Sequence, residues 1–133
     1  MATFKFELVS PERMLFSGDV QSVVVPGVDG EFQVFAGHAP MMSTLRPGVL
    51  TVAQGDGTPM RLFVRGGFAD VAPSGFTLLA EQAIPLSEMK PEELARSIKE
   101  AQEDLNDARS DEARSLAAER LAQLQDLQRA IIN

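Results

Sequence analysis

The composition of this chain changes abruptly near residue 87. All ten glycines lie at or before Gly75, all eight phenylalanines lie at or before Phe76, and no proline follows Pro91. The first part is rich in Val, Phe and Gly, which strands and tight turns favour. The second part is rich in Ala, Leu, Glu, Gln and Arg, which favour helices. We therefore expect a β domain at 1–86 and an α-helical element at 87–133.

The pattern of the first region predicts a series of short strands. Phe4, Phe6 and Leu8 alternate with polar residues, which is typical of a half-buried strand, whereas the run Val23–Val25 does not alternate and predicts a strand covered on both faces. Gly and Pro separate the apolar runs at a spacing of roughly ten residues, which predicts a β-sandwich or barrel of about eight to ten short strands. The clearest strand runs are 4–8, 20–25, 32–35, 49–53, 60–65, 68–72 and 76–80, with Gly55-Asp56-Gly57 marking one of the turns.

The second region reads as two antiparallel helices, at 91–109 and 111–131. Pro91 suits a first helical turn, and Glu92 and Glu93 follow it at the positive end of the helix dipole. Ser110 is the expected N-cap of the second helix. The predicted seam between the helices is made of Leu94, Ile98, Ala101, Leu105 and Ala108 on the first, and Ala117, Leu121, Leu124 and Ile131 on the second, with Leu127 beside it. Because this seam is narrow, we expect the hairpin to need a further packing surface.

Charge and composition exclude several classes of function. The net charge of −7 disfavours a nucleic-acid partner and anionic lipid, since both need clustered Lys and Arg. The absence of cysteine excludes disulfides and thiolate metal sites. The first ten residues carry Lys5 and Glu7 and no apolar run, so we do not expect them to form a signal peptide. No stretch approaches the roughly 18 apolar residues of a membrane span. We expect no direct membrane insertion.

No constellation of catalytic residues is visible, and we expect neither an enzyme nor a cofactor. His38 is the single histidine, and beside Pro40 it is interpreted as a structural or interface residue, because a general base needs a positioned partner. Asp29 and Glu31 are interpreted as a turn Asp and a solvated strand-edge Glu rather than a catalytic pair. Met41 and Met42 mark either an adaptable interface or core packing.

Several short motifs, in a fixed order, resemble the epsilon subunit of rotary (F-type) proton-translocating ATP synthases. They are Val9-Ser10-Pro11-Glu12, Phe16-Ser17-Gly18, Val24-Val25-Pro26-Gly27 with Gly30-Glu31, Gly37-His38-Ala39-Pro40, Leu45 with Pro47-Gly48, Gly66-Gly67-Phe68-Ala69-Asp70-Val71 and Ala80-Glu81. Each motif alone is weak, but their order and spacing together are specific. The resemblance extends over the whole chain.

The resemblance implies a non-catalytic subunit of the central stalk. In that family the sandwich binds the gamma subunit, rests on the polar loops of the membrane c-ring, and turns with the rotor. By position, Glu31 corresponds to the residue that abuts the c-ring, and His38 lies in the loop on the side of gamma and the ring, with Met41 and Met42 just after it. The implied location is peripheral, at the cytoplasmic face of the energy-transducing (inner or plasma) membrane.

The sequence departs from the family pattern in three places. At Gln33 the family usually has Gly, and this difference affects only the local backbone shape. The other two departures concern regulation. Lys90 and Glu93 stand where nucleotide-binding members have Asp and Arg, and a carboxylate there repels phosphate, so we expect weak or no ATP binding. Residues 87–133 hold eleven acids and seven bases, a net charge of −4, which disfavours entry into an acidic alpha/beta catalytic head. We expect weak self-inhibition.

Two alternatives remain open at the level of sequence. One is a nucleotide-sensing regulator of ATP hydrolysis that acts through the helical hairpin, and the other is an unrelated adaptor with a sandwich and a helical arm. Binding of Mg-ATP by the isolated chain would favour the first, and failure to associate with gamma would favour the second.

Overall fold

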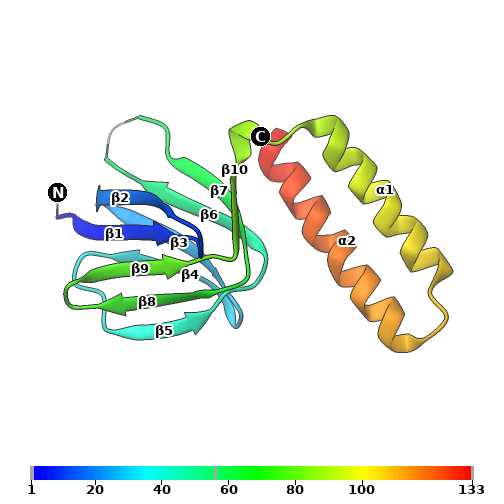
Figure 1. Ribbon diagram of the computed structural model, residues 1–133, viewed down its shortest axis with the longest axis horizontal. Coiled ribbons are helices and arrows are strands. Elements are labelled where there is room, and N and C mark those ends of the chain that lie inside the picture. The colour runs from blue at the N-terminus through cyan, green and yellow to red at the C-terminus, as the bar shows by residue number, and fades with distance from the viewer. Residues whose placement is uncertain (1, 56, 133) are drawn as a thin grey trace. The chain divides into compact units, whose positions relative to one another are not determined.

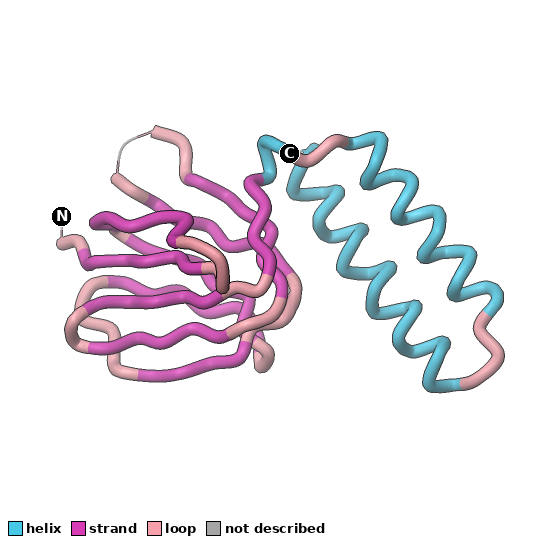
Figure 2. Tube along the Cα trace, in the orientation of Figure 1, coloured by secondary structure: helices cyan, strands magenta, loops and turns pink. Residues whose placement is uncertain are grey.

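A computed structural model describes residues 2–55 and 57–132, so the predicted turn residue Asp56 lies outside the described residues. The chain divides into two compact units, Met1–Pro85 and Leu86–Asn133. The first holds every described strand and the second every described helix, as Figures 1 and 2 show. The docking and regulatory roles assigned to the two regions stay predictions.

The first unit is a β-sandwich of two five-stranded sheets. One sheet has the order β2-β1-β9-β8-β5, and the other has the order β10-β7-β6-β3-β4. The strands are β1 (Phe4–Val9), β2 (Met14–Val20), β3 (Ser22–Gly27), β4 (Gly30–Phe35), β5 (Met41–Thr44), β6 (Gly48–Ala53), β7 (Met60–Arg65), β8 (Phe68–Ala72), β9 (Gly75–Leu79) and β10 (Gln82–Pro85). Neighbouring strands are antiparallel except β1 and β9, which are parallel.

The core of the sandwich lies between the two sheets. Alternation places Phe6 and Leu8 of β1 opposite Phe76 and Leu78 of β9, and all four side chains are buried. The rings of Phe6 and Phe76 lie 5.2 Å apart between centroids and are tilted by 48°. From the other sheet, Val23, Val25, Val34, Leu50, Val52 and Val64 complete this core. Val24 is half-buried on the opposite face of β3, so this strand is at least partly covered on both sides.

The second unit is a short 3-10 turn (Leu86–Glu88) followed by the hairpin of α1 (Pro91–Asp107) and α2 (Asp111–Ile132). Helix α1 has Pro91 in its first turn. Ser110 caps α2, since its Oγ accepts a hydrogen bond from the backbone N of Ala113 at 3.1 Å. The two helices pack against each other along the predicted seam, where Leu94, Ala101 and Leu121 are buried. No described helix is both long enough and apolar enough to cross a membrane.

The predicted fold class is confirmed, and the differences are local. Strand β5, strand β10 and most of β2 were absent from the predicted runs, because their short segments carry polar residues or proline. The first helix ends two residues early, since Ala108 takes an extended conformation (φ −62°, ψ 130°) before Ser110 caps the next helix. Leu127 is buried rather than merely beside the seam.

Candidate functional site

Two edge strands, β4 of one sheet and β5 of the other, meet on one side of the sandwich. The backbone N of Val28 donates to the carbonyl O of Thr44 at 2.9 Å, and Gly27 forms a β-bridge with Leu45. These bonds tie the β3–β4 turn to the end of β5. At their other ends, β4 and β5 are joined by the short loop 36–40 (Figure 2). The sandwich is therefore closed on this side by side chains and turns rather than by a further strand.

A shallow open hollow of about 490 Å³ lies where the two edges converge. Three of the residues that the sequence singled out, Glu31, Met41 and Met42, line it together. The remaining lining residues are Val28, Asp29, Gly30, Phe32, Ser43 and Thr44. The hollow combines apolar side chains with two carboxylates, so it suits a partner segment that carries a cation beside apolar atoms.

The turn that carries Asp29 and Glu31 is held by close backbone packing. Gly30 has φ +134°, a conformation that residues with a side chain rarely adopt. A Cβ on Gly27 would lie 2.8 Å from the carbonyl O of Gly30 and 2.8 Å from the ring of Phe32. A side chain at Gly27 would therefore force a shift in the turn that carries Glu31.

The adjacent methionines of β5 face opposite ways. Met41 packs against the sandwich core, whereas Met42 is 67% exposed. This is the alternation expected of a strand. The core interpretation therefore describes Met41, and the interface interpretation of Met42 stays a prediction.

His38 does not join the other three predicted site residues. It lies beyond the end of β4 and lines a second hollow of about 270 Å³, together with Phe4, Phe35 and Phe76. Its Nδ1 lies 2.7 Å from the carbonyl O of Ala39, and its backbone N donates to Phe35 O at 3.1 Å. These bonds support the interpretation of His38 as a residue that shapes the loop.

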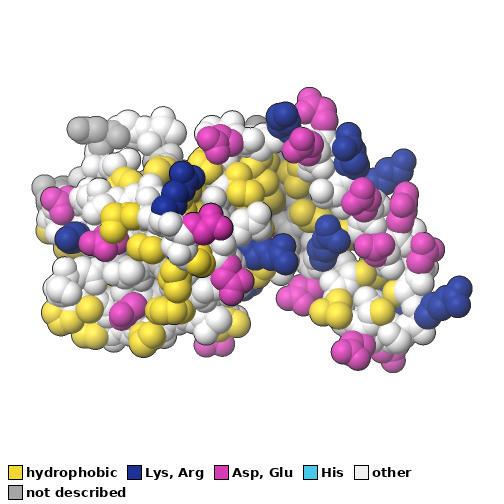
Figure 3. Space-filling view, viewed as in Figure 1, with side chains coloured by type: hydrophobic (Ala, Val, Ile, Leu, Met, Phe, Trp, Pro, Cys, Tyr) yellow, Lys and Arg dark blue, Asp and Glu magenta, His cyan; other side chains and the backbone are white. Residues whose placement is uncertain are grey.

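The sequence did not predict an apolar row that lies on the outer face of the β2-β1-β9-β8-β5 sheet. Strand register aligns Met14 with Val9, Val9 with Leu79, and Leu79 with Phe68. Met14 is 54% exposed and Phe68 is 39% exposed. On β5 the register partner of Phe68 is Thr44, and exposed Met42 lies on the same outer face two residues along the strand, opposite Asp70. We call Met14, Val9, Leu79, Phe68 and Met42 the apolar row. Figure 3 shows hydrophobic side chains on this face among charged ones.

Sequence alone gives only a weak signal for this row. Phe68 and Leu79 each stand at an outward position of a predicted strand, and Val9 directly follows one, where a single apolar residue is unremarkable. Only the pairing of four strands shows that they line up. The signal that was available is the outward placement of Phe68 directly after Gly67 at the start of a strand.

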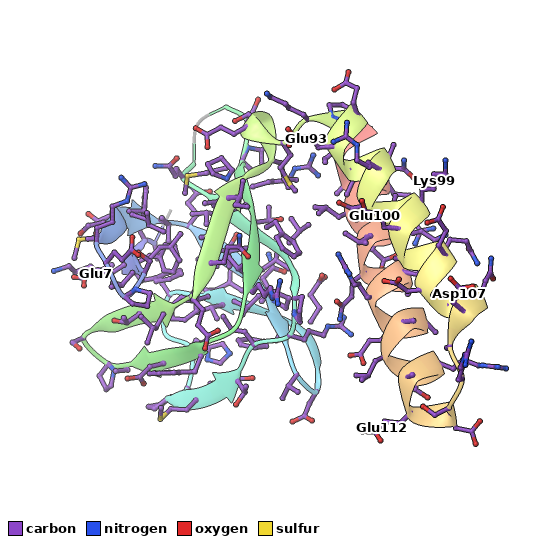
Figure 4. The ribbon with its side chains drawn as sticks, turned by 45° about the vertical axis from the view of Figure 1, so that its right-hand side comes forward. Glu7, Glu93, Lys99, Glu100, Asp107 and Glu112 are labelled. Carbon is purple, nitrogen blue, oxygen red and sulfur yellow. The ribbon has the colours of Figure 1, made fainter. Side chains whose placement is uncertain are left out.

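The start of α1 carries the residues that argue against nucleotide binding. Lys90 occupies the N-cap position and makes no side-chain capping hydrogen bond. Glu92 and Glu93 lie exposed in the first turn. Figure 4 shows Glu93, Lys99, Glu100 and Asp107 along α1 and Glu112 at the start of α2. The surface of the hairpin is thus mostly acidic along α1.

Two of the three arginines on α2 are engaged within the hairpin. Arg120 Nη1 lies 4.0 Å from Asp104 Oδ2 of α1, and Arg129 pairs with Asp126 one turn earlier. Both pairs are exposed, so each contributes little to stability. They nevertheless reduce the positive charge that α2 offers to an acidic partner.

Among the described residues there is no group of three or more His, Cys, Asp and Glu side chains that could hold a metal ion. The carboxylates of the hollow, Asp29 and Glu31, are exposed at the surface. The features of this molecule that stand out are therefore surfaces: the hollow, the apolar row and the hairpin.

Comparison with known proteins decides the family. A family model described as "ATP synthase, Delta/Epsilon chain, beta-sandwich domain" matches residues 3–86. The ATP synthase epsilon chain of Mesorhizobium japonicum is 54% identical over 129 residues, which cover 97% of this chain and 96% of that protein. The chain belongs to the ATP synthase epsilon chain family. The epsilon chain of Parvibaculum lavamentivorans agrees, at 50% identity over 95% of this chain and 96% of its own length.

Solved structures extend the likeness to the helical hairpin. A chain in the cryo-EM structure of the Euglena gracilis mitochondrial ATP synthase, OSCP/F1/c-ring in rotational state 1, matches with a TM-score of 0.86 and 26% identity. The match covers 98% of this chain and 82% of that one. A chain in the central stalk/c-ring structure from Tetrahymena thermophila shares the fold alone, with a TM-score of 0.69 and 12% identity. The family resemblance drawn from the sequence motifs is confirmed.

Proposed function

We propose that this member of the epsilon chain family is a non-catalytic rotor subunit of an F-type ATP synthase. Its sandwich links the gamma subunit to the membrane c-ring and couples proton flow to ATP synthesis. It works as a peripheral subunit at the cytoplasmic face of the energy-transducing membrane. The observation that carries this proposal is the hollow that unites Glu31, Met41 and Met42 beside the apolar row.

Transmission of torque needs a body that does not deform, and the sandwich meets this need. Its core side chains come from both sheets and are buried, and protein interiors are close-packed with low compressibility. No bond chemistry is required of such a body. The working parts are outer surfaces held in a fixed relation to one another.

The hollow is the proposed c-ring contact. Glu31 and Asp29 present carboxylates on a tight turn, in which Gly27 has no room for a side chain and Gly30 has a positive φ. Met42 contributes adaptable apolar surface beside them. A polar loop with a basic residue would place its cation against the carboxylates and its stem against the methionine.

The apolar row is the proposed gamma contact, with His38 and its loop as a neighbouring contact. Phe68, Met14 and Met42 are exposed apolar side chains on one outer face of the sheet, and exposed apolar side chains that gather on one face mark interaction sites. Residues 1–86 hold eight acids and five bases, a net charge of −3, so the facing surface of gamma should carry basic residues around an apolar centre.

The hairpin is the proposed packing or regulatory element, with weak influence on hydrolysis. Glu93 in the first turn of α1 repels phosphate, and the α2 arginines Arg120 and Arg129 pair with acids of the hairpin itself. We therefore expect weak or no ATP binding and only weak inhibition through the alpha/beta head. The rival function, a nucleotide-sensing regulator, predicts micromolar binding of Mg-ATP by calorimetry. An adaptor unrelated to ATP synthases is incompatible with the family membership.

Measurement of the affinity of the full chain for purified gamma tests the proposal. Phe68→Asp places a charge in the apolar row and should weaken binding by about tenfold or more, since buried unpaired charge at an interface costs over 1.4 kcal/mol. Leu116→Asp is the matched control, because Leu116 is 62% exposed on α2, outside the row. Equal binding by the two variants would contradict the assignment of the row to gamma.

A second experiment tests the hairpin. The assembled enzyme carrying this chain truncated after Leu86 should hydrolyse ATP at nearly the rate of the enzyme with the full chain. A severalfold rise in hydrolysis would show that the hairpin inhibits strongly. Binding of the truncated chain to the assembly must be verified first, so that loss of the subunit is not mistaken for loss of inhibition.

A further inference from the structure

Strand β5 provides an internal comparison between two methionines. Met41 and Met42 are neighbours in sequence, yet Met41 packs on the sandwich core and Met42 is 67% exposed at the rim of the hollow. A thioether is oxidised readily when a dissolved oxidant can reach it. The two side chains therefore differ in access to solvent while they share one strand.

From this difference we propose that Met42 is a site of reversible oxidation by peroxides. The sulfoxide weakens docking of the sandwich on its stalk partners, a consequence that rests on the proposed function. The site acts before assembly, because a docked partner would cover it.

The step is a two-electron oxygen transfer. A lone pair of Met42 Sδ attacks one oxygen of hydrogen peroxide, the O–O bond breaks, and a proton moves to the departing oxygen, which leaves as water. Sulfur is oxidised to the sulfoxide and the peroxide is reduced. A methionine sulfoxide reductase reverses the change with electrons from a dithiol, which becomes a disulfide as water is released.

The change should affect docking rather than folding. Met42 faces outward from an edge strand, opposite Asp70 of β8, and its neighbour along the same face of the strand pair is Phe68. A sulfoxide is polar, so its burial under a partner without a hydrogen bond is costly. In the isolated chain the sulfoxide stays in water, and the sandwich core does not sense it.

Graded hydrogen peroxide on the full chain, followed by peptide mass spectrometry, tests the order of oxidation. Met42 should oxidise first and Met14, which is 54% exposed, next. Met41 and Met60, both packed against the core, should oxidise several-fold more slowly. Oxidation of Met41 at the rate of Met42 would overturn the proposal, because the two differ in little except exposure.

Binding measurements on oxidised variants test whether the sulfoxide weakens docking. Met14→Leu removes the other thioether that is exposed among the described residues. After peroxide, the M14L chain should bind gamma or the c-ring about tenfold more weakly than the same chain before treatment, and should recover on treatment with reductase. The M14L/M42L chain, compared with its own untreated sample, should show no such response to peroxide. Unaltered binding by oxidised M14L would refute the regulatory claim. Failure of the reduced chain to bind either partner would instead refute the proposed function, independently of the oxidation order.

Discussion

The sandwich and the helical hairpin of this chain are built from different kinds of contact. Sixteen buried hydrophobic residues form the sandwich core, and they come from strands far apart in sequence, such as β1 and β9. The hairpin packs two helices that are neighbours in sequence along a seam with few buried side chains, among them Leu94, Ala101 and Leu121. A dense core contributed by the whole unit predicts rigidity, whereas a narrow local seam predicts easier opening. This difference suits a stiff docking body with an adaptable appendage.

The strongest test of this difference removes one ring from the sandwich core. Phe76 is 1% exposed, and Phe76→Ala should lower the free energy of unfolding by about 3–5 kcal/mol, because lost burial and a new cavity act together. Chemical denaturation, with hydrogen exchange as the readout, measures the loss in the free energy of unfolding for each region. Leu121→Ala in the hairpin seam should cost less. An equal cost would remove the distinction between the two regions.

A second test addresses the turn that holds Glu31. Gly27→Ala should destabilise the sandwich by about 1–3 kcal/mol, since the new Cβ would lie 2.8 Å from Gly30 O and from the Phe32 ring. Gly18→Ala is the matched control, because its Cβ would lie 3.4 Å from Phe16, an ordinary contact. Thermal unfolding of both variants decides the matter, and the account fails if Gly18→Ala is the more harmful.

The caps of the hairpin should matter less than the core. Ser110→Ala removes the hydrogen bond to the Ala113 backbone N and should destabilise the hairpin by about 1 kcal/mol. Ser110→Asp keeps an acceptor and should be nearly neutral. Helicity measured by circular dichroism during denaturation reports both variants. A loss equally large for Asp would mean that the hydroxyl acts by something other than capping.

Helix α1 offers the opposite experiment, because its N-cap residue makes no capping hydrogen bond. Lys90→Ser should stabilise α1 by roughly 0.5–1 kcal/mol by adding an acceptor for the orphan backbone N–H groups. Lys90→Ala supplies no acceptor and serves as the control. Slower hydrogen exchange in the first turn of α1 is expected for the Ser variant alone, and the same slowing in both variants would argue against capping.

The smallest expected effect comes from the ion pair between the helices. Arg120→Gln should change the stability of the hairpin by only about 0.2–0.5 kcal/mol, because both side chains of the pair with Asp104 are more than half exposed. The difference should vanish in high salt. A larger, salt-independent effect would show that Arg120 packs rather than pairs.

The sequence allowed the architecture to be predicted because the two regions obey different periodicities. Glycine and proline punctuation located most strands, and the Pro91 and Ser110 signals located both helix starts. Strand β5 could not be found in this way, since Met41–Thr44 is short and gains its place by pairing with β8. Strand β10 contains Pro85, which weakens any strand signal.

The candidate site was predicted in its parts but not in its assembly. Glu31, Met41 and Met42 were each singled out, yet only the bonds between the β3–β4 turn and Thr44 show that they share one hollow. His38 was grouped with them and lies in another hollow. The apolar row depends on the register of several strands, and a single sequence does not reveal register between strands far apart in the chain.

The central claim is that the outer surface of the sandwich binds the stalk partners. Hydrogen exchange of the full chain, alone and reconstituted with purified gamma and c-ring, tests this claim most directly. Amides of β5, the β3–β4 turn and the start of β8 should gain protection in the complex, while those of α1 and α2 should change little. Protection confined to the hairpin, with an unchanged sandwich, would contradict the account.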